Sequence, residues 1–162
     1  MQELTAEAIR ASFVNAEERD LELLDIPLDH MLIDWFPLDF LGWRDASTRS
    51  RCYVVVELDG VATGLVLRAA QSTARAHNGI CNICRTMQPG NQVTMMSARK
   101  GGEAGRRGES IGTYMCADLS CHSNVRLAHP LAPGEFRASV DFRIDSTARR
   151  MRDFVRRVRD AE

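Results

Sequence analysis

Four of the five cysteines are gathered in a spacing that strongly restricts the fold. Cys81 and Cys84 are separated by two residues, 31 residues follow, and Cys116 and Cys121 are separated by four. Two cysteines two residues apart can turn their thiolates toward one ion on a tight knuckle, and four thiolates complete a closed tetrahedral shell around zinc. The sequence therefore predicts one structural Zn²⁺ ion held by all four, with no open position for a substrate.

The residues between and after the two pairs predict how the chain wraps around this ion. Residues 92–98 and 111–115 are expected to form two returning strands, and a short helical pattern follows in 117–128. Cys116 then lies at a strand end and Cys121 in the first turn of a helix. Knuckle, hairpin and helix around one ion make a treble clef, so the predicted fold class is α+β.

Two other interpretations of the cysteines fit the sequence less well. A thioredoxin-like dithiol needs Cys-x-x-Cys opening a helix after a strand, and the turn residues Pro89 and Gly90 lie just downstream of the first pair. His77 precedes that pair in the spacing of zinc-binding anti-sigma factors, which would leave the second pair unexplained. His77 and His122 are therefore interpreted as non-ligands, because four sulfurs already saturate the ion.

Residues 99–108 form a glycine-rich basic segment between the two expected strands. The segment does not match a P-loop, because its one lysine, Lys100, precedes the glycines. We expect a flexible basic finger. A contact role and a plain solvated loop both remain open for it.

The first part of the chain predicts helices followed by a hairpin. Residues 4–24 indicate one or two helices, and 28–43 an apolar connector with short helical turns. Residues 53–68 are typical of a β-hairpin, because Asp59 and Gly60 between two β-branched runs favour a two-residue turn with positive φ.

The last part of the chain predicts an amphipathic helix with Ser146 as its N-cap. Residues 136–144 are ambiguous between strand and helix. Arginines cover most of the helix surface, and an apolar stripe at helical spacing marks its buried face. That stripe consists of Met151, Phe154, Val155 and Val158.

Charge divides the chain into two parts that the net charge of −1 conceals. Residues 1–45 hold 11 acidic and 3 basic residues, a net charge of −8, and residues 46–162 have a net charge of +7. We expect 1–45 to be an acidic helical segment packed on an α+β zinc-binding domain of 46–162, the two forming one compact unit. A basic face of this kind suits an acidic protein or a nucleic acid.

Several classes are disfavoured by composition. No apolar run approaches the roughly 20 residues that a membrane span needs, and the first ten residues lack the apolar core of a secretory signal. We expect a cytoplasmic location, where clustered cysteines indicate metal rather than disulfides. No catalytic arrangement of Ser, His and Asp or of paired carboxylates stands out, so the chain is not expected to be an enzyme.

The sequence resembles the elongation factor G-binding protein C-terminal treble-clef zinc-finger family, the module shared with FusB-type fusidic-acid-resistance proteins. The resemblance runs over most of the chain. It is strongest in Cys81-Asn82-Ile83-Cys84, Ala98-Arg99-Lys100-Gly101 and Gly112-Thr113-Tyr114-Met115-Cys116-Ala117-Asp118.

The resemblance implies a function for particular residues. The zinc ligands would be the four clustered cysteines, and the partner would be elongation factor G, which the resistance members release from ribosomes stalled by fusidic acid. Contacts to the factor would fall on Arg99, Lys100, Tyr114 and Phe154, although Phe154 also fits the apolar stripe of the last helix. The resistance proteins carry a separate N-terminal helical bundle, for which 162 residues leave little room.

Two rival functions remain open at this point. One is an RNA-binding zinc module that uses the basic finger and the terminal arginines; the absence of aromatic residues interleaved with the finger disfavours it. The other is a redox-switched zinc protein that loses its metal on oxidation. The sequence does not decide whether the chain confers resistance, how the factor would be released, or the oligomeric state.

Overall fold

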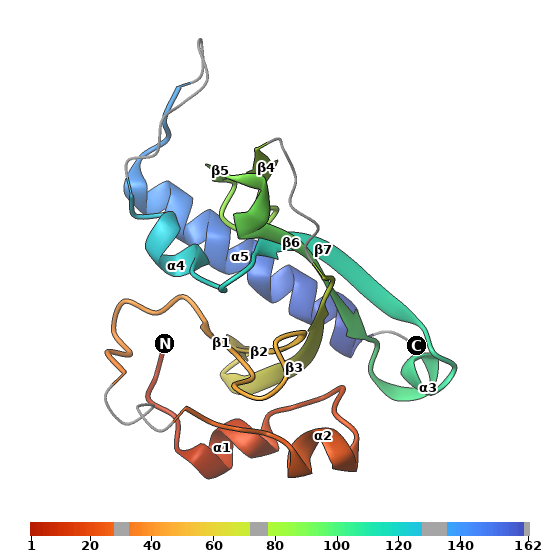
Figure 1. Cartoon of the computed structure of the whole chain (residues 1–162). Helices are drawn as coiled ribbons and strands as arrows, with labels where there is room; N and C mark the ends of the chain where they lie inside the picture. Colours follow the sequence, from red (N-terminus) through yellow and green to blue (C-terminus); the bar gives the residue numbers. More distant parts are fainter. Residues whose placement is uncertain (28–32, 72–77, 128–135, 161–162) are drawn as a thin grey trace.

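A five-stranded antiparallel sheet forms the centre of the protein (Figure 1). The computed structural model describes residues 1–27, 33–71, 78–127 and 136–160. The strand order is β1-β2-β3-β6-β7. These strands are β1 (Leu41–Arg44), β2 (Arg51–Leu58), β3 (Val61–Ala69), β6 (Val93–Arg99) and β7 (Ser110–Cys116).

Short elements complete the fold around this sheet. A second, two-stranded sheet of β4 (Gly79–Ile80) and β5 (Met87–Gln88) is inserted between β3 and β6, and the 3₁₀ turn η2 (Gly90–Gln92) follows it. The helices are α1 (Ala6–Ala11), α2 (Glu18–Glu22), α3 (Gly102–Arg106), α4 (Cys121–Asn124) and α5 (Val140–Arg159). Within the described residues, no helix has the length and apolar character needed to span a bilayer.

The β2–β3 hairpin confirms the turn that the sequence predicts. Asp59 and Gly60 connect the strands with φ angles of 54° and 79°. Two consecutive positive φ angles are what a type I′ turn requires, and the twist of that turn matches the twist of the strands. Pairing extends from Leu58 opposite Val61 to Arg51 opposite Arg68.

The sheet is covered on both faces, so β2 is buried along nearly its whole length. Alternate residues of a strand point to opposite faces. Val54 and Val56 belong to a core cluster beneath α5, whereas Tyr53 and Val55 belong to a second cluster beneath the N-terminal segment. Figure 1 shows α5 on one side of the sheet and α1 and α2 on the other.

Helix α5 is longer than the sequence pattern indicates. It begins at Val140, and the Ser139 side chain caps it by accepting a hydrogen bond from the Phe142 backbone at 3.2 Å. The predicted N-cap at Ser146 is therefore wrong, because Ser146 lies inside the helix and is buried. The ambiguous segment 136–144 is helical from Val140 onward, and the predicted apolar stripe packs in the core.

The connector at 28–43 contains a strand rather than only helical turns. Residues 41–44 form β1, with Trp43 opposite Tyr53 of β2, and the two rings stack with centroids 5.0 Å apart. This long-range aromatic pair outweighs the local pattern that suggested turns. Residues 28–32 of the predicted connector lie outside the described residues.

The expected flexible finger at 99–108 is a compact helical turn. Helix α3 spans part of it, and Ala104 and Gly105 are buried. The Gly101 backbone donates to the Val158 carbonyl of α5 at 2.8 Å, and a Cβ atom on Gly105 would stand 1.8 Å from the Lys100 carbonyl oxygen. Glycine thus serves close packing here rather than freedom of movement.

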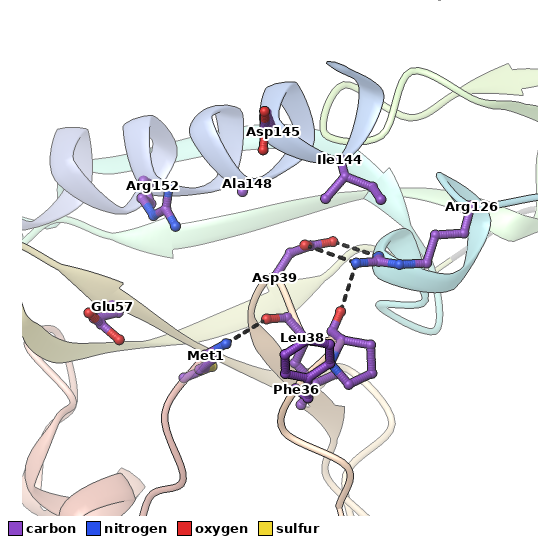
Figure 2. A pocket seen from close by; sticks show the side chains of 11 residues that line it. Met1, Phe36, Leu38, Asp39, Glu57, Arg126, Ile144, Asp145, Ala148 and Arg152 are labelled. Atoms are coloured by element: carbon purple, nitrogen blue, oxygen red, sulfur yellow. Dashed lines mark hydrogen bonds and ion pairs between the residues drawn. The ribbon is translucent and has the colours of Figure 1, made fainter. Parts of the chain in front are cut away.

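Arg126 connects residues 36–39 of the N-terminal segment to the chain just after α4. Its guanidinium donates to Asp39 at 2.9 Å and to the Pro37 carbonyl at 2.8 Å. Figure 2 shows this fork at the edge of a hollow of about 510 Å³ between the N-terminal segment, β2 and α5. Since Asp39 is nearly buried, the pair is partly shielded from solvent and fixes the connector firmly.

Asp45 is a buried carboxylate that closes the turn after β1. It accepts hydrogen bonds from the Ser47 and Thr48 backbones at 2.9 and 2.6 Å and from the Tyr53 hydroxyl at 2.9 Å. Burial acts to raise its pKa, but these hydrogen bonds, the Thr48 one first, and the charge of Arg51 lower it. Burial and the bond to Asp45 raise the pKa of Tyr53 to about 12.

We predict that Gly64→Val loosens the N-terminal segment. A Cβ atom at Gly64 would lie 2.6 Å from the Ser12 hydroxyl and 3.0 Å from the Phe13 ring, where Phe13 and Gly64 form a bridge. Overpacking of this kind should lower the free energy of unfolding by about 2 kcal/mol. Urea unfolding measures this loss. Gly112→Val is the control, because its Cβ meets the flexible Met95 side chain at 3.0 Å. Equal stability of the two variants would contradict the prediction.

We predict that Asp45→Asn makes the free energy of unfolding less dependent on pH between about pH 7 and pH 3. Because the pKa of Asp45 is lowered in the fold, the carboxylate stabilises the protein above its unfolded value of 3.8, and this contribution is lost as pH falls below that value. The variant should lose about 1–3 kcal/mol at pH 7. Its deficit relative to wild type should shrink toward pH 3 in denaturant titrations; a deficit that stays constant with pH would refute this.

Candidate metal centre

The four predicted cysteines converge at one point. Their sulfur atoms all lie within 4.8 Å of one another and all four residues are buried. The Sγ atoms of Cys81 and Cys121 are 3.6 Å apart, as are those of Cys84 and Cys116. Tetrahedral zinc with Zn–S bonds of about 2.3 Å places sulfurs about 3.8 Å apart. The cluster therefore fits one Zn²⁺ ion, as the spacing predicts.

The first pair lies on a turn between β4 and β5 that resembles a zinc knuckle in its hydrogen bonds. The backbones of Ile83 and Cys84 donate to the Cys81 sulfur at 3.3 and 3.4 Å. The Arg85 backbone donates to the Cys81 carbonyl at 2.9 Å, and Arg85 has a φ of 59°. These donors stabilise negative charge on sulfur and orient it before any metal is bound.

The second pair is positioned by the end of β7 and the start of α4. Cys116 is the last residue of the strand and Cys121 the first of the helix, as predicted. Leu119, with a φ of 63°, turns the chain between them. The side-chain amides of Gln88 and Asn124 donate to the Cys116 sulfur at 3.2 and 3.4 Å. Neither amide was singled out in the sequence, because no local pattern marks such donors.

A hydrogen bond joins the knuckle directly to the hairpin. The Asn82 backbone donates to the Tyr114 carbonyl at 2.8 Å, two residues before Cys116. The Ala117 backbone donates to the Gln92 carbonyl at 2.8 Å, one residue before β6. The two cysteine pairs are therefore brought together by the backbone as well as by a metal.

The electrostatics of the cluster favour a bound cation. Hydrogen bonding with Cys116, and then with Cys121, lowers the pKa of Cys81. Hydrogen bonding with Cys116 and Cys81, together with burial, raises the pKa of Cys121. The four sulfurs lie within reach of one another, and four thiolates in a buried site need a compensating positive charge. Zinc supplies that charge and would hold all four as ligands, stabilising the fold.

The remaining cysteine and His122 do not belong to the sulfur cluster. Cys52 is fully buried in β2, as a small apolar residue would be. His122 packs its ring edge against Phe40, with centroids 6.4 Å apart, and burial lowers its pKa. His77 lies outside the described residues.

The structure distributes the four predicted partner contacts over different environments. Arg99 forms an ion pair with Glu17, and Lys100 forms one with Glu109 at 2.9 Å. Tyr114 is half-buried on β7.

The expectation for Phe154 needs correction. Phe154 is 1% exposed, inside the core cluster beneath α5, so its side chain is not presented to a partner. Its position in the apolar stripe accounts for this, since the stripe is the face that α5 turns toward the sheet.

We predict that Cys84→Ser abolishes stoichiometric zinc and unfolds the half of the chain around β6 and β7. Structural zinc sites contribute about 10–16 kcal/mol of apparent binding free energy in finger peptides at pH 7. Cys52→Ala is the matched control: it removes a cysteine from the core but no sulfur from the cluster, and should retain one zinc per chain. Metal analysis and circular dichroism measure both. A folded, zinc-loaded Cys84→Ser protein would disprove the assignment.

Comparison with known proteins agrees with this geometry. A family model described as FBP C-terminal treble-clef zinc-finger matches residues 8–158. Searches of curated proteins and of solved structures returned no match. The match spans both the cysteine cluster and the N-terminal segment, and it confirms the expected treble clef and the α+β class. The chain belongs to the FBP C-terminal treble-clef zinc-finger family.

Proposed function

We propose that the protein is a non-catalytic, zinc-stabilised binding protein whose partner is elongation factor G. Membership of the treble-clef family over residues 8–158 carries this proposal, because the family resemblance includes modules that bind this factor. The buried cysteine cluster supports it in chemical terms. A closed shell of four sulfurs leaves zinc no coordination position for a substrate. The ion therefore stabilises the fold that carries the binding surface.

The β6–β7 hairpin is the proposed contact region. It presents Arg99, Lys100 and Tyr114. One end of the hairpin lies at the metal cluster, where Val93 pairs with Cys116, and the other end, where Arg99 pairs with Ser110, carries α3. Arg99 pairs with Glu17 at an exposed position, and Lys100 pairs with Glu109 at a partly buried one. Exposed ion pairs are weak and exchange readily, so acidic groups of a partner can replace these glutamates.

The cellular role that follows is assistance to the elongation factor during its cycle on the ribosome. Release of a factor stalled by fusidic acid is the form this takes in the resistance proteins that the sequence resembles. The proposal includes a cytoplasmic location, where both the factor and reduced thiols are found.

RNA binding and redox switching are less well supported as functions. Residues 99–108, which an RNA-binding finger would use, include no aromatic side chain on which a base could stack. The four sulfurs are buried, and buried cysteines react slowly with oxidants.

We predict that the zinc-loaded chain retains elongation factor G in a pull-down at low salt. The variant carrying Arg99→Gln, Lys100→Gln and Tyr114→Ala should weaken this binding at least about tenfold, as loss of several interface contacts does. Arg49→Gln, outside the hairpin, is the control and should bind like wild type. Isothermal calorimetry provides the affinities. Failure of the folded wild-type chain to bind the factor would refute the proposal.

A further inference from the structure

A hollow of about 430 Å³ lies beside the knuckle, between the knuckle turn, β7 and α5. We name it the knuckle pocket. Its polar and charged lining residues come from these three elements. They are Asn82, Arg85, Thr113, Arg150, Asp153 and Arg157.

The positive charge of the knuckle pocket is not balanced by carboxylates. Asp153 lies in its wall, but its carboxylate accepts a hydrogen bond from Arg156 at 3.2 Å. Burial first, and then the charge of Arg85, lowers the pKa of Arg150. Within the described part of the chain, Arg85 and Arg157 make no ion pair with a carboxylate; Arg157 stacks over the Phe154 ring at 5.9 Å.

The basic residues of the α3 turn provide a contrast. Each of them already has an acidic partner, so this turn is nearly neutral at its surface. The pairs are Arg99–Glu17, Lys100–Glu109, Arg106–Glu103 and Arg107–Glu109. In the knuckle pocket, by contrast, Arg85 and Arg157 form no ion pair with a carboxylate among the described residues.

Arg85 occupies a backbone position that disfavours it. Its φ of 59° lies in the left-handed region, which costs a residue with a Cβ atom roughly 1–2 kcal/mol. Glycine or asparagine would adopt this conformation more easily. The side chain held at this position lines the knuckle pocket.

We propose that the knuckle pocket binds the carboxylate of an acidic side chain presented by the protein partner, an inference that rests on the proposed function. Arginine presents two parallel N–H donors that match a carboxylate in shape and charge. The Thr113 hydroxyl accepts from the Asn82 amide at 3.3 Å and keeps its own proton for a ligand oxygen.

A carboxylate suits the knuckle pocket better than an RNA backbone does. Asp153 stands in the wall and would repel a continuous line of phosphates. The Phe154 ring is 1% exposed, so it offers no surface on which a base could stack. A single acidic side chain brings one negative charge and needs no stacking surface, so Arg85 and Arg157 can pair with it although Asp153 lies in the same wall.

The test measures binding of a glutamate-rich hexapeptide to the ¹⁵N-labelled, zinc-loaded full chain. The peptide should shift the amide signals of Asn82, Thr113 and Arg150, and its glutamine version should not. The double variant Arg85→Asn/Arg157→Gln should weaken peptide binding and elongation factor G binding by about tenfold or more. Asparagine tolerates the φ at position 85, so the knuckle should keep its zinc, which metal analysis verifies.

Arg152→Gln is the matched control, because it removes one charge from an exposed position of α5 that lines the other hollow. It should change both affinities by less than about twofold, as a screened distant charge does. Unchanged affinities in the double variant would overturn the inference, as would tighter binding of oligouridylate than of the peptide at the same amides. If wild type fails to bind the factor, the proposed function falls, and the peptide titration still decides whether the pocket binds carboxylates.

Discussion

The convergence of four thiolates on one ion is the interaction on which the rest of the structure depends. It ties together the knuckle turn, the end of β7 and the start of α4. The knuckle strands of two residues each and the four-residue helix α4 are too short to stay folded without such a link. The metal thus joins these pieces to the core that the sheet and α5 form, which includes Ile83, Leu119 and Val125 beside the cysteines.

The parts of the site that could be predicted are those encoded by local spacing. The Cys-x2-Cys pair, the turn at Asp59-Gly60 and the stripe of α5 each obey a short-range geometric rule, and each was found at the expected place. Strand β1 and the amide donors Gln88 and Asn124 depend on partners distant in the sequence. Their positions follow from the packed fold, so no local pattern could reveal them.

The glycine-rich segment 99–108 suggests flexibility from its composition but is closely packed in the structure. A run rich in glycine and arginine suggests a mobile loop, because glycine has the largest conformational freedom. In the α3 turn, the same glycines allow backbone to approach backbone, and Gly101 contacts the last turn of α5. Freedom in the unfolded chain and close packing in the folded one come from the same missing Cβ atom. Only the tertiary contacts decide which of the two matters.

The uneven charge of the chain has its main explanation inside the molecule. Acidic residues of the first 45 form ion pairs across to the basic remainder, Glu17 with Arg99, Asp20 with Arg68 and Asp39 with Arg126. Two of the three are exposed and weak, whereas the Asp39 pair is partly buried and directional. Three of the 18 basic residues in 46–162 therefore help to attach the N-terminal segment to the rest of the fold. Arg85 and Arg157 beside the zinc knuckle have no carboxylate partner among the described residues, and a small basic site of this kind favours recognition of particular acidic side chains over attraction to any polyanion.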